Sequence, residues 1–357
     1  MTTRQAVLAA LQASPDFVSG EDLAQTCAVS RTSVWKAIKS LQAEGHNIEA
    51  VSNRGYKLTA SADPINSTYI AEKIAELGVS AGAVSAFSEI DSTLSESKRR
   101  CASVTAFRTA AGTLTADGEK LHRSLIVAGK QTAGRGRMGR PFASPANSGI
   151  YFTLIYAPKN GVTNPALLTA AAAVAVARAT DELFGTRAQI KWVNDVFLDG
   201  KKICGILTEG LANFETGRIE AANVGIGINV RDMGFTGQLA QIATSICQTA
   251  PDKEKAASIS RNDVVAHVAA HLLRFYDAWE NDNHEIISSC LSEYRSRSFL
   301  IGKKVTINPA AGLEGDIYKA TVLDIADDAS LVVELSDGSR KNLQSGEISL
   351  HSSEFTQ

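Results

Sequence analysis

The sequence predicts an α+β protein made of three consecutive parts, and three observations support this fold class. Residues 1–62 contain three short helical patterns followed by a hairpin pattern. Residues 63–299 mix helices with apolar strands that cluster rather than alternate strictly, which favours α+β over a doubly wound sheet. Residues 300–357 contain short strands separated by turn signals. A length of 357 residues agrees with two or three domains, at roughly 100–200 residues per domain.

Composition and charge exclude several classes of protein. With 44% hydrophobic and 21% charged residues, the chain is neither collagen-like nor intrinsically disordered. A net charge of −2 means that any nucleic-acid site must be local. The five cysteines are scattered and contain no C-x-x-C, which favours reduced thiols in the cytoplasm. The N-terminus does not resemble a signal peptide, and the Ala-rich segment Pro165–Ala179 is too short for a membrane helix.

The N-terminal part has the order of a winged helix-turn-helix. Apolar periodicity predicts a helix over residues 3–13, a second over Gly20–Thr26 and a third over residues 31–44. A hairpin with an SNRG turn fits Ile48–Val51 and Tyr56–Leu58. Three helices and a β-wing in residues 1–62 predict a DNA-binding domain.

The third of these helices has two different faces. Val34, Ile38 and Leu41 form an apolar stripe, and polar side chains lie on the opposite side. Residues 30–60 carry a local charge of +3, from five basic and two acidic residues. A solvated helix face is one explanation, but the complete helix-turn-helix-wing order favours contacts with DNA. The predicted DNA-binding residues are Thr32, Lys36 and Lys39 on the helix and Arg54 on the wing.

Patterns in the central and C-terminal parts predict further elements. The predicted helices are Ser67–Leu77, Asn164–Phe184 and Arg261–Asn281, and the predicted strands are Leu125–Ala128, Ile150–Tyr156, Val196–Leu198, Ile203–Glu209, Ala221–Val230, Lys304–Ile307, Tyr318–Asp324 and Leu331–Leu335. The segment Thr105–Arg123 is polar and shows no periodicity, which indicates a flexible insertion. The short strands after Gly302 predict a small β-barrel or sandwich.

A glycine- and arginine-rich segment, KQTAGRGRMGR at Lys130–Arg140, is the strongest candidate for a binding loop. Its glycines spell G-x-G-x-x-G, but two prolines and a strand follow instead of a helix, so a dinucleotide-binding fold is excluded. Glycines let the backbone lie close to a ligand, and arginines pair with phosphate or carboxylate oxygens. Arg135, Arg137 and Arg140 therefore predict an acidic small ligand, with an exposed basic loop as the alternative.

Two apolar strands carry polar residues of interest. Lys191 in IKWVND is flanked by apolar residues, so it is either a pocket lysine that neutralises approaching anions or a surface lysine. VGIGINV offers Asn229 as a polar contact beside glycines that permit close approach. His267 and His271 have helical spacing, but Val268 stands where a zinc-protease helix needs Glu, so no metal site is predicted.

Five motifs in order make the chain resemble the biotin–protein ligases. They are DST at Asp91–Thr93, GRGRMGR at Gly134–Arg140, KWVND at Lys191–Asp195, CGILTEG at Cys204–Gly210 and GIGIN at Gly225–Asn229. The winged helix and a C-terminal segment ending in SGEISL, Ser345–Leu350, are similar to the bifunctional biotin operon repressors of this family. The resemblance covers nearly the whole chain.

The resemblance implies a fold and a two-step reaction. The implied domains are a winged helix-turn-helix over residues 1–62, a class II aminoacyl-tRNA-synthetase-like ligase domain over 63–299 and an SH3-like barrel over 300–357. Biotin and ATP, with Mg²⁺, would give biotinyl-5′-AMP, from which a lysine of a biotin carboxyl carrier protein takes the biotin. Operator DNA and an adenylate-induced homodimer are the other implied partners, and no membrane is involved.

The resemblance also implies roles for single residues. Ser92, Thr93, Leu94 and Gln131 correspond to contacts of the biotin head, while Arg135, Gly136 and Arg137 form the loop over biotin and the adenylate phosphate. Lys191 would hold the carboxylate and the α-phosphate together, so Lys191 and Arg137 are the implied catalytic residues. Arg135, Arg137, Arg140, Asn194 and Asn229 are the implied nucleotide contacts.

The chain departs from the family at three positions. Leu94 replaces a frequent Asn, Val193 replaces Pro and Phe142 replaces Trp. Two alternatives to a ligase that is also a repressor stay open. One is a regulator that senses its ligand through an inactive ligase domain, and the other is a relative that acts on lipoate or octanoate.

Overall fold

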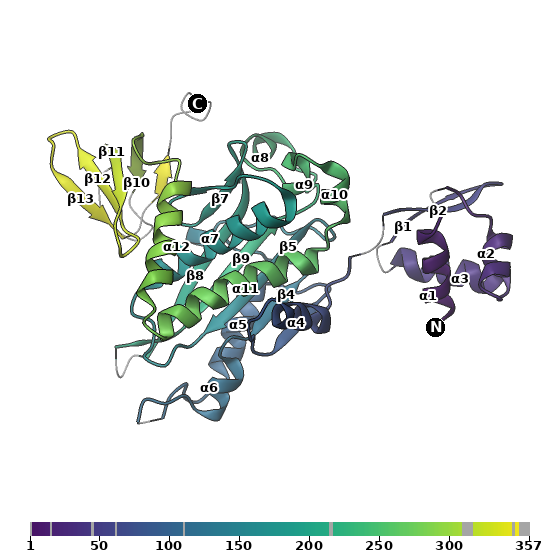
Figure 1. Ribbon diagram of the computed structural model, residues 1–357, viewed down its shortest axis with the longest axis horizontal. Helices are drawn as coiled ribbons and strands as arrows, with labels where there is room; N and C mark the ends of the chain where they lie inside the picture. The colour runs from purple at the N-terminus through teal and green to yellow at the C-terminus, as the bar shows by residue number, and fades with distance from the viewer. Residues whose placement is uncertain are drawn as a thin grey trace. The chain divides into compact units, whose positions relative to one another are not determined.

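The computed structural model describes residues 2–14, 16–43, 46–60, 63–109, 111–213, 217–308, 317–344 and 347–349. The chain divides into two compact units, a smaller one at Met1–Pro64 and a larger one at Ile65–Gln357. Figure 1 labels most of the elements of the two units, which are described separately below. The finer division into three domains at residues 62 and 299 stays a prediction.

The smaller unit has the predicted order of three helices and a hairpin. Its elements are α1 (Thr3–Gln12), α2 (Gly20–Thr26), α3 (Arg31–Ala43), β1 (Asn47–Val51) and β2 (Gly55–Ala60), and the two strands pair antiparallel. The helices begin where the sequence offers caps, because the Thr2 and Ser19 side chains accept backbone N–H groups of α1 and α2. The predicted end of the third helix at residue 44 lies outside the described residues.

Apolar side chains from all three helices and the hairpin form the core of the smaller unit. The predicted stripe of α3 is buried, and the core consists of Val7, Leu11, Leu23, Val34, Ala37, Ile38, Leu41 and Ile48. Helical periodicity placed the stripe of α3, since a short amphipathic helix has only one apolar stripe to bury. The predicted winged helix-turn-helix pattern is confirmed.

A seven-stranded mixed sheet is the framework of the larger unit. Its order is β3-β4-β5-β9-β8-β7-β6, with a parallel β3–β4 pair and antiparallel pairs elsewhere. The strands are β3 (Val84–Phe87), β4 (Leu125–Ala128), β5 (Gly149–Tyr156), β6 (Gln189–Lys191), β7 (Asp195–Leu198), β8 (Lys201–Ala212) and β9 (Ile219–Asn229). The predicted α+β class is confirmed, and every predicted central strand lies in this sheet.

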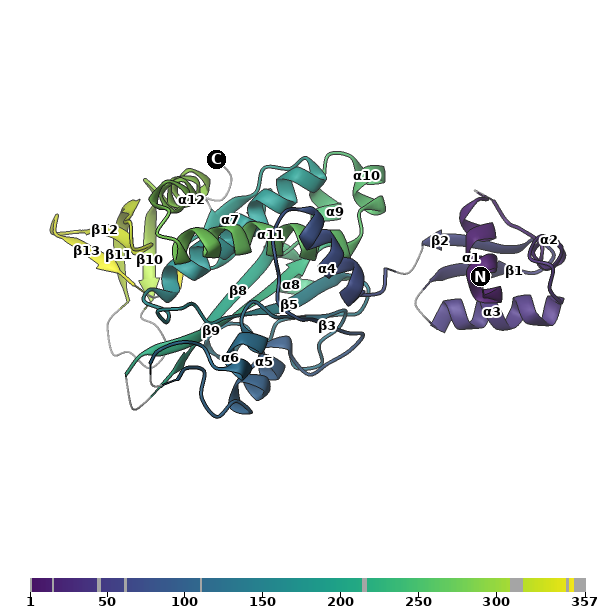
Figure 2. The same cartoon turned by 60° about the horizontal axis from the view of Figure 1, so that its bottom comes forward.

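Helices lie on both faces of this sheet. Four of them, α4, α7, α11 and α12, pack together over one face, and α5 lies against the other (Figures 1 and 2). Their bounds are α4 (Ser67–Glu76), α5 (Thr93–Ala102), α7 (Pro165–Phe184), α11 (Arg261–Glu280) and α12 (His284–Arg297). In the part of the chain that the structure describes, no helix is both long and apolar enough to cross a membrane.

Side-chain alternation along the strands separates the two faces. Leu125 and Val127 of β4 join the core beneath α7 and α11, whereas Ile126 joins a second cluster beneath α5. Phe152 and Ile155 of β5 divide in the same way. Because successive strand residues point to opposite faces, strands covered on both sides read as continuous apolar runs. This explains why apolar runs, rather than alternation, predicted β4 and β5.

The segment Thr105–Arg123 is not the flexible insertion that we expected. It contains α6 (Ala116–Leu121), which begins at a Thr115 cap, and Phe107 is only 5% exposed in the cluster beneath α5. The prediction was wrong because the apolar anchors, Phe107, Leu114 and Leu121, lie seven residues apart among small and polar residues, which is too sparse to form the apolar stripe of a helix or the alternation of a strand. Residue 110 lies outside the described residues.

Three short helices follow one another between β9 and α11. They are α8 (Gly237–Ile242), α9 (Ile246–Thr249) and α10 (Lys253–Ser258), and a single 3₁₀ turn, η1 (Arg137–Gly139), lies within the arginine-rich loop. Met138 and Gly139 in this turn have positive φ angles of 57° and 71°. The loop therefore continues as a turn and not as the helix that a dinucleotide-binding motif requires.

The C-terminal part of the larger unit is a five-stranded antiparallel sheet. Its order is β13-β12-β11-β10-β14, built from β10 (Lys304–Asn308), β11 (Tyr318–Ile325), β12 (Leu331–Leu335), β13 (Arg340–Leu343) and β14 (Glu347–Ser349). Among the described residues, no pairing joins β13 to β14 to close a barrel. The indole N–H of Trp192 donates to Ala329 O at 2.9 Å, so this sheet contacts the segment between β6 and β7. Residues 345, 346 and 350 of SGEISL lie outside the described residues.

Candidate functional site

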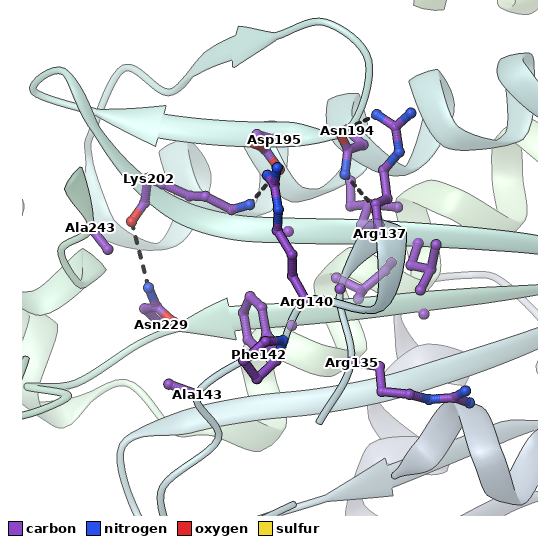
Figure 3. Close-up of a pocket in the computed structure, with 18 of the residues that line it drawn as sticks. Arg135, Arg137, Arg140, Phe142, Ala143, Asn194, Asp195, Lys202, Asn229 and Ala243 are labelled. Carbon is purple, nitrogen blue, oxygen red and sulfur yellow. Dashed lines mark hydrogen bonds and ion pairs between the residues drawn. The ribbon is translucent and has the colours of Figure 1, made fainter. Parts of the chain in front are cut away.

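A cavity of about 750 Å³ opens on the face of the large sheet that α5 covers. Its wall comes from the start of α5, the arginine-rich loop, the β6–β7 segment and strands β5, β8 and β9 (Figure 3). All eleven small-ligand residues predicted from the sequence line this one cavity: Ser92, Thr93, Leu94, Gln131, Arg135, Gly136, Arg137, Arg140, Lys191, Asn194 and Asn229. Segments separated by more than a hundred residues thus meet at one place.

Gly205 and Gly227 lie beneath the Phe142 ring and form the floor of the cavity. Tyr151, Gly227, Gly205 and Asp195 are paired in register across β5, β9, β8 and β7. A Cβ atom on Gly227 would lie 2.5 Å from the Phe142 ring, and one on Gly205 would lie 3.2 Å from it. Only glycine leaves room for the ring at Gly227, because real Cβ contacts do not come so close. Phe142 also meets Tyr151 edge to face at 6.3 Å between ring centroids.

The arginine-rich loop is closed on itself by backbone hydrogen bonds. Gly136 N donates to Arg140 O at 2.7 Å, and Phe142 N donates to Gly134 O at 2.9 Å. Its side chains point to different places: Arg135 donates to Ser95 Oγ of α5 at 3.1 Å, and Arg137 donates to Asn194 Oδ1 at 3.3 Å. Figure 3 shows Arg140 extending toward Asp195 and Lys202. The loop therefore brings positive charge to both sides of the cavity.

A network of hydrogen bonds orients the polar groups at the start of α5. Gln131 Oε1 accepts from Thr93 N at 2.8 Å, and its Nε2 donates to Ser144 Oγ at 3.0 Å. Thr153 Oγ1 donates to Thr93 Oγ1 at 3.0 Å, and Ser92 caps the helix. These groups are preorganised, since their rotamers are held by partners within the wall.

Leu94, the residue that follows Ser92 and Thr93, is apolar. Leu94 is 4% exposed and lies against β9, where a Cβ atom on Gly225 would be 3.5 Å from Leu94 Cδ1. The cavity thus has an apolar wall directly after the polar residues Ser92 and Thr93.

Asp91, just before Ser92, anchors this end of the cavity. Both carboxylate oxygens accept from Arg99, at 2.8 and 2.9 Å, and Oδ1 also accepts from Ser92 N at 2.7 Å. The hydrogen bonds from Arg99, assisted by the backbone N–H, lower the pKa of Asp91 to about 2. Asp91 does not line the cavity but fixes the turn from which Ser92 enters α5.

Two lysines from neighbouring strands reach the cavity. Lys191 ends β6, and Lys202 of β8 donates to Asp195 Oδ1 at 2.6 Å. Sequence reasoning identified Lys191 but missed Lys202, whose only signal was its place at the start of an apolar strand in KKICG. Among the described residues that line the cavity, Asp195 is the one carboxylate, so the wall carries an excess of positive charge.

Asn229 holds a buried acceptor without a partner. Its side chain is 4% exposed, and Nδ2 donates to Thr244 O at 2.9 Å. No described residue donates a hydrogen bond to its Oδ1. A buried acceptor without a donor is costly, so a donor from a ligand in the cavity would compensate it.

A protein-ligated metal site is not apparent near the cavity. Within the described ranges, no three His, Cys, Asp or Glu side chains are grouped so that they could hold a metal ion. His267 and His271 of α11 instead face Glu182, with nitrogen–oxygen distances of 3.6 and 2.8 Å.

The predicted DNA-binding residues lie on the surface of the smaller unit. Thr32, Lys36 and Lys39 are exposed on the side of α3 opposite its buried stripe. Arg54 is exposed in the turn of the hairpin, with its guanidinium 4.2 Å from the centroid of the Phe17 ring. The helix and the wing each present cations to solvent.

Three family models match consecutive parts of the chain. An HTH domain matches residues 3–57, the biotin/lipoate A/B protein ligase family matches residues 114–229, and a biotin protein ligase C-terminal domain matches residues 300–351. The second match contains most of the cavity wall, including both lysines and the arginine-rich loop.

Similar proteins cover nearly the full length. The bifunctional ligase/repressor BirA of Bacillus subtilis is 32% identical over 332 residues, which are 92% of this chain and 93% of that protein. BirA of Escherichia coli is 25% identical over 347 residues, 97% of each chain. A solved biotin protein ligase from Aquifex aeolicus, in complex with biotin and ATP, has a similar fold, with a TM-score of 0.54 at 22% identity over 75% of this chain and 98% of that chain.

Proposed function

Because this chain belongs to the family of the bifunctional ligase/repressor BirA, we propose that it is an ATP-dependent biotin–protein ligase and a biotin-responsive transcriptional repressor. One observation carries the ligase half of this proposal. This one cavity has three kinds of surface: a polar end held by hydrogen bonds, an apolar floor that contains glycines, and several cationic side chains. Biotin, a bicyclic ring system with a carboxylate tail, and a nucleotide phosphate need these three surfaces.

The polar end binds the head of biotin. Ser92, Thr93 and Gln131 offer hydroxyl and amide groups that are already oriented, and Leu94 offers apolar contact where the family often makes a polar one. The Phe142 ring, which packs on Gly205 and Gly227, forms an apolar wall for the remainder of the vitamin. The carboxylate tail then points toward the cationic groups.

The cationic groups bring two anions together. In the first step a biotin carboxylate oxygen attacks the α-phosphorus of ATP, a P–O bond forms, and the bond to pyrophosphate breaks. Arg137 and Lys191 offset the repulsion between carboxylate and phosphate, and Arg135 and Arg140 close the loop over the product. The loop also excludes water from the mixed anhydride.

The second step transfers biotin to the carrier protein. The neutral amine of a carrier lysine attacks the acyl carbon, an amide bond forms, AMP leaves, and the amine loses its proton to solvent. The cations that stabilised the pentavalent phosphorus now stabilise the departing phosphate oxygen. One set of cations therefore serves both steps.

Lys202 is a second candidate for the role that the sequence assigns to Lys191. Both ammonium groups line the cavity, but Lys202 is held at 2.6 Å by Asp195, which fixes its position before substrate binds. Preorganised charge is more effective than charge that must reorient during the reaction. We therefore include Lys202 among the residues that contact the α-phosphate.

Asn229 and Asn194 contact the nucleotide. The unpaired Oδ1 of Asn229 suits the exocyclic amine of adenine, which is a donor. Asn194 donates to Ile206 O at 2.8 Å and accepts from Arg137, so it positions that arginine. Mg²⁺ would enter as MgATP, because the described residues provide no carboxylate cage and Asp195 is engaged by Lys202.

The repressor half rests on the smaller unit. Its exposed cations on α3 and Arg54 on the hairpin form the surface that binds operator DNA. We further propose that the adenylate-bound form is a homodimer, that the central fold is of the class II synthetase type and that the C-terminal sheet is an SH3-like barrel. A cytoplasmic location belongs to the same proposal and agrees with five free cysteines.

Biotin-dependent exchange of pyrophosphate into ATP tests the ligase claim. Intact protein should catalyse exchange with biotin and much less with lipoate; no exchange with either acid would refute it, and preference for lipoate would reassign the substrate. Lys191→Gln and Lys202→Gln should each lower exchange by about 10²–10³-fold where the lysine contacts the phosphate. Lys73→Gln, a lysine on α4 paired with Glu76 and absent from the cavity wall, is the control and should match wild type.

A further inference from the structure

The third helix of the smaller unit exposes a tryptophan. Trp35 of α3 is 52% exposed, and it is the only large apolar side chain of that unit found exposed among the described residues. The core is complete without it, because Val34, Ala37, Ile38 and Leu41 of the same helix are buried. Trp35 is therefore not needed to complete this core, and its exposed ring is available for contact with a partner.

Trp35 lies on the same face as the predicted DNA contacts. At about 100° per residue, Thr32, Trp35, Lys36 and Lys39 fall within an arc of roughly 100° on α3. All four are exposed, whereas the opposite side of the helix is buried. The exposed indole is thus bordered by two lysines and a threonine.

The charges around this face of α3 indicate which kind of partner it binds. Lys36 and Lys39 make it cationic, Arg54 adds an exposed cation on the hairpin of the same unit, and the acid Glu21 lies 3.8 Å from Arg31. A cationic face with one large apolar side chain fits a polyanion that also presents apolar groups. The major groove of DNA presents both, since phosphates border it and thymine methyl groups project into it.

From this arrangement we propose that Trp35 is a specificity-determining residue that contacts a thymine methyl group in the major groove. The inference rests on the repressor half of the proposed function and deepens it. The lysines and Arg54 bind phosphates and set affinity, whereas Trp35 selects sequence. Its place in the first two turns of α3 agrees with this role, because the N-terminal part of a recognition helix approaches base edges.

The experiment removes one methyl group at a time. Intact protein with biotin and ATP is used to select binding sites from a randomised duplex DNA library, and each thymidine of the selected duplex is then replaced singly by deoxyuridine. Wild-type protein should lose about fourfold in affinity at one thymidine per half-site, the factor expected from one methyl-sized contact. Trp35→Ala should bind the thymine and uracil duplexes equally, and Trp35→Phe should keep part of the difference.

Two controls separate this role from others. The slope of affinity against salt should be the same for Trp35→Ala and wild type, because no phosphate contact is lost. Ile286→Ala, which truncates an exposed apolar side chain of α12 in the larger unit, should leave the uracil effect unchanged.

The outcomes distinguish this inference from the function on which it rests. If wild type selects a sequence but shows no uracil effect, or if Trp35→Ala keeps the full effect, the assignment of Trp35 is wrong while the repressor stands. If Trp35→Ala changes the oligomeric state instead, the indole belongs to a protein interface and the assignment is also wrong. If wild type enriches no sequence, the repressor function and the inference fail together.

Discussion

The unpaired oxygen of Asn229 predicts which nucleotide the enzyme prefers. Nδ2 faces the carbonyl oxygen of Thr244 at 2.9 Å, and a carbonyl can only accept, so the amide orientation is fixed and Oδ1 must face a donor. Adenine presents an exocyclic amine, whereas hypoxanthine presents a carbonyl at the same position. ATP should satisfy the buried oxygen, and inosine triphosphate should leave it unpaired.

The magnitude follows from the burial of this group. At 4% exposure the oxygen has almost no access to water, and an unpaired buried acceptor costs about 1–3 kcal/mol. Wild type should therefore prefer ATP over inosine triphosphate by about 5- to 150-fold in kcat/KM for biotin-dependent exchange. In Asn229→Leu, which has a similar shape but no polar atoms, the ratio should fall to about one.

The measured quantity is the ratio of kcat/KM with ATP to kcat/KM with inosine triphosphate, because a loss of stability lowers both values and cancels in their ratio. Asn229→Leu also leaves Thr244 O unpaired, which should lower the free energy of unfolding, and thermal unfolding measures that effect separately. Equal use of the two nucleotides by wild type would refute the reasoning, as would a variant that keeps the preference for ATP.

Three other predictions follow from the geometry. Gly227→Ala should push the Phe142 ring away from β9 and disturb the apolar wall of the cavity, raising KM for biotin by about tenfold, and adding Phe142→Leu should recover part of the loss; a variant with unchanged KM would contradict the close packing of the ring on Gly227. Lys36→Ala with Arg54→Ala should weaken DNA binding in a gel shift and reduce the salt slope by about 2, while biotin transfer stays at the wild-type rate. Because the pKa of Asp91 is lowered to about 2, its contribution to stability should be complete above pH 4 and fade as pH falls toward 2. Asp91→Asn should therefore lower Tm at pH 7 and have less effect on Tm at pH 3. An equal effect on Tm at both pH values would argue against the ionic contact with Arg99.

The elements that the sequence predicted well are those with a strong period or a long apolar run. Helix α11 was expected at Arg261–Asn281 and ends one residue earlier, with Asn281 as its cap. Strand β4 was expected at Leu125–Ala128 and has those bounds. In both cases burial imposes the pattern, because a helix with one exposed stripe and a strand covered on both faces leave distinct signatures.

Other elements gave no such signal. Helix α5, Thr93–Ala102, is mostly polar and was not predicted as a helix, since its capping by Ser92 and its ion pairs carry no period. The residues of the candidate site were predicted more completely than α5, because they belong to contiguous sequence motifs. Lys202 was missed because its importance comes from Asp195, which approaches it from the neighbouring strand β7, seven residues earlier in the chain. Contacts made by tertiary pairing are visible only once the sheet register is known.

The hydrogen bond from Trp192 to Ala329 has a consequence for dissecting the protein. Its donor stands beside Lys191 in the cavity wall, and its acceptor lies between two strands of the C-terminal sheet. Ile348 of the last strand also lines the cavity. In a chain cut after residue 299, the indole N–H of Trp192 would lack its acceptor, and the cavity would lose the apolar side chain of Ile348 from its wall. Truncation should therefore yield a less stable fragment with impaired activity, rather than a minimal enzyme.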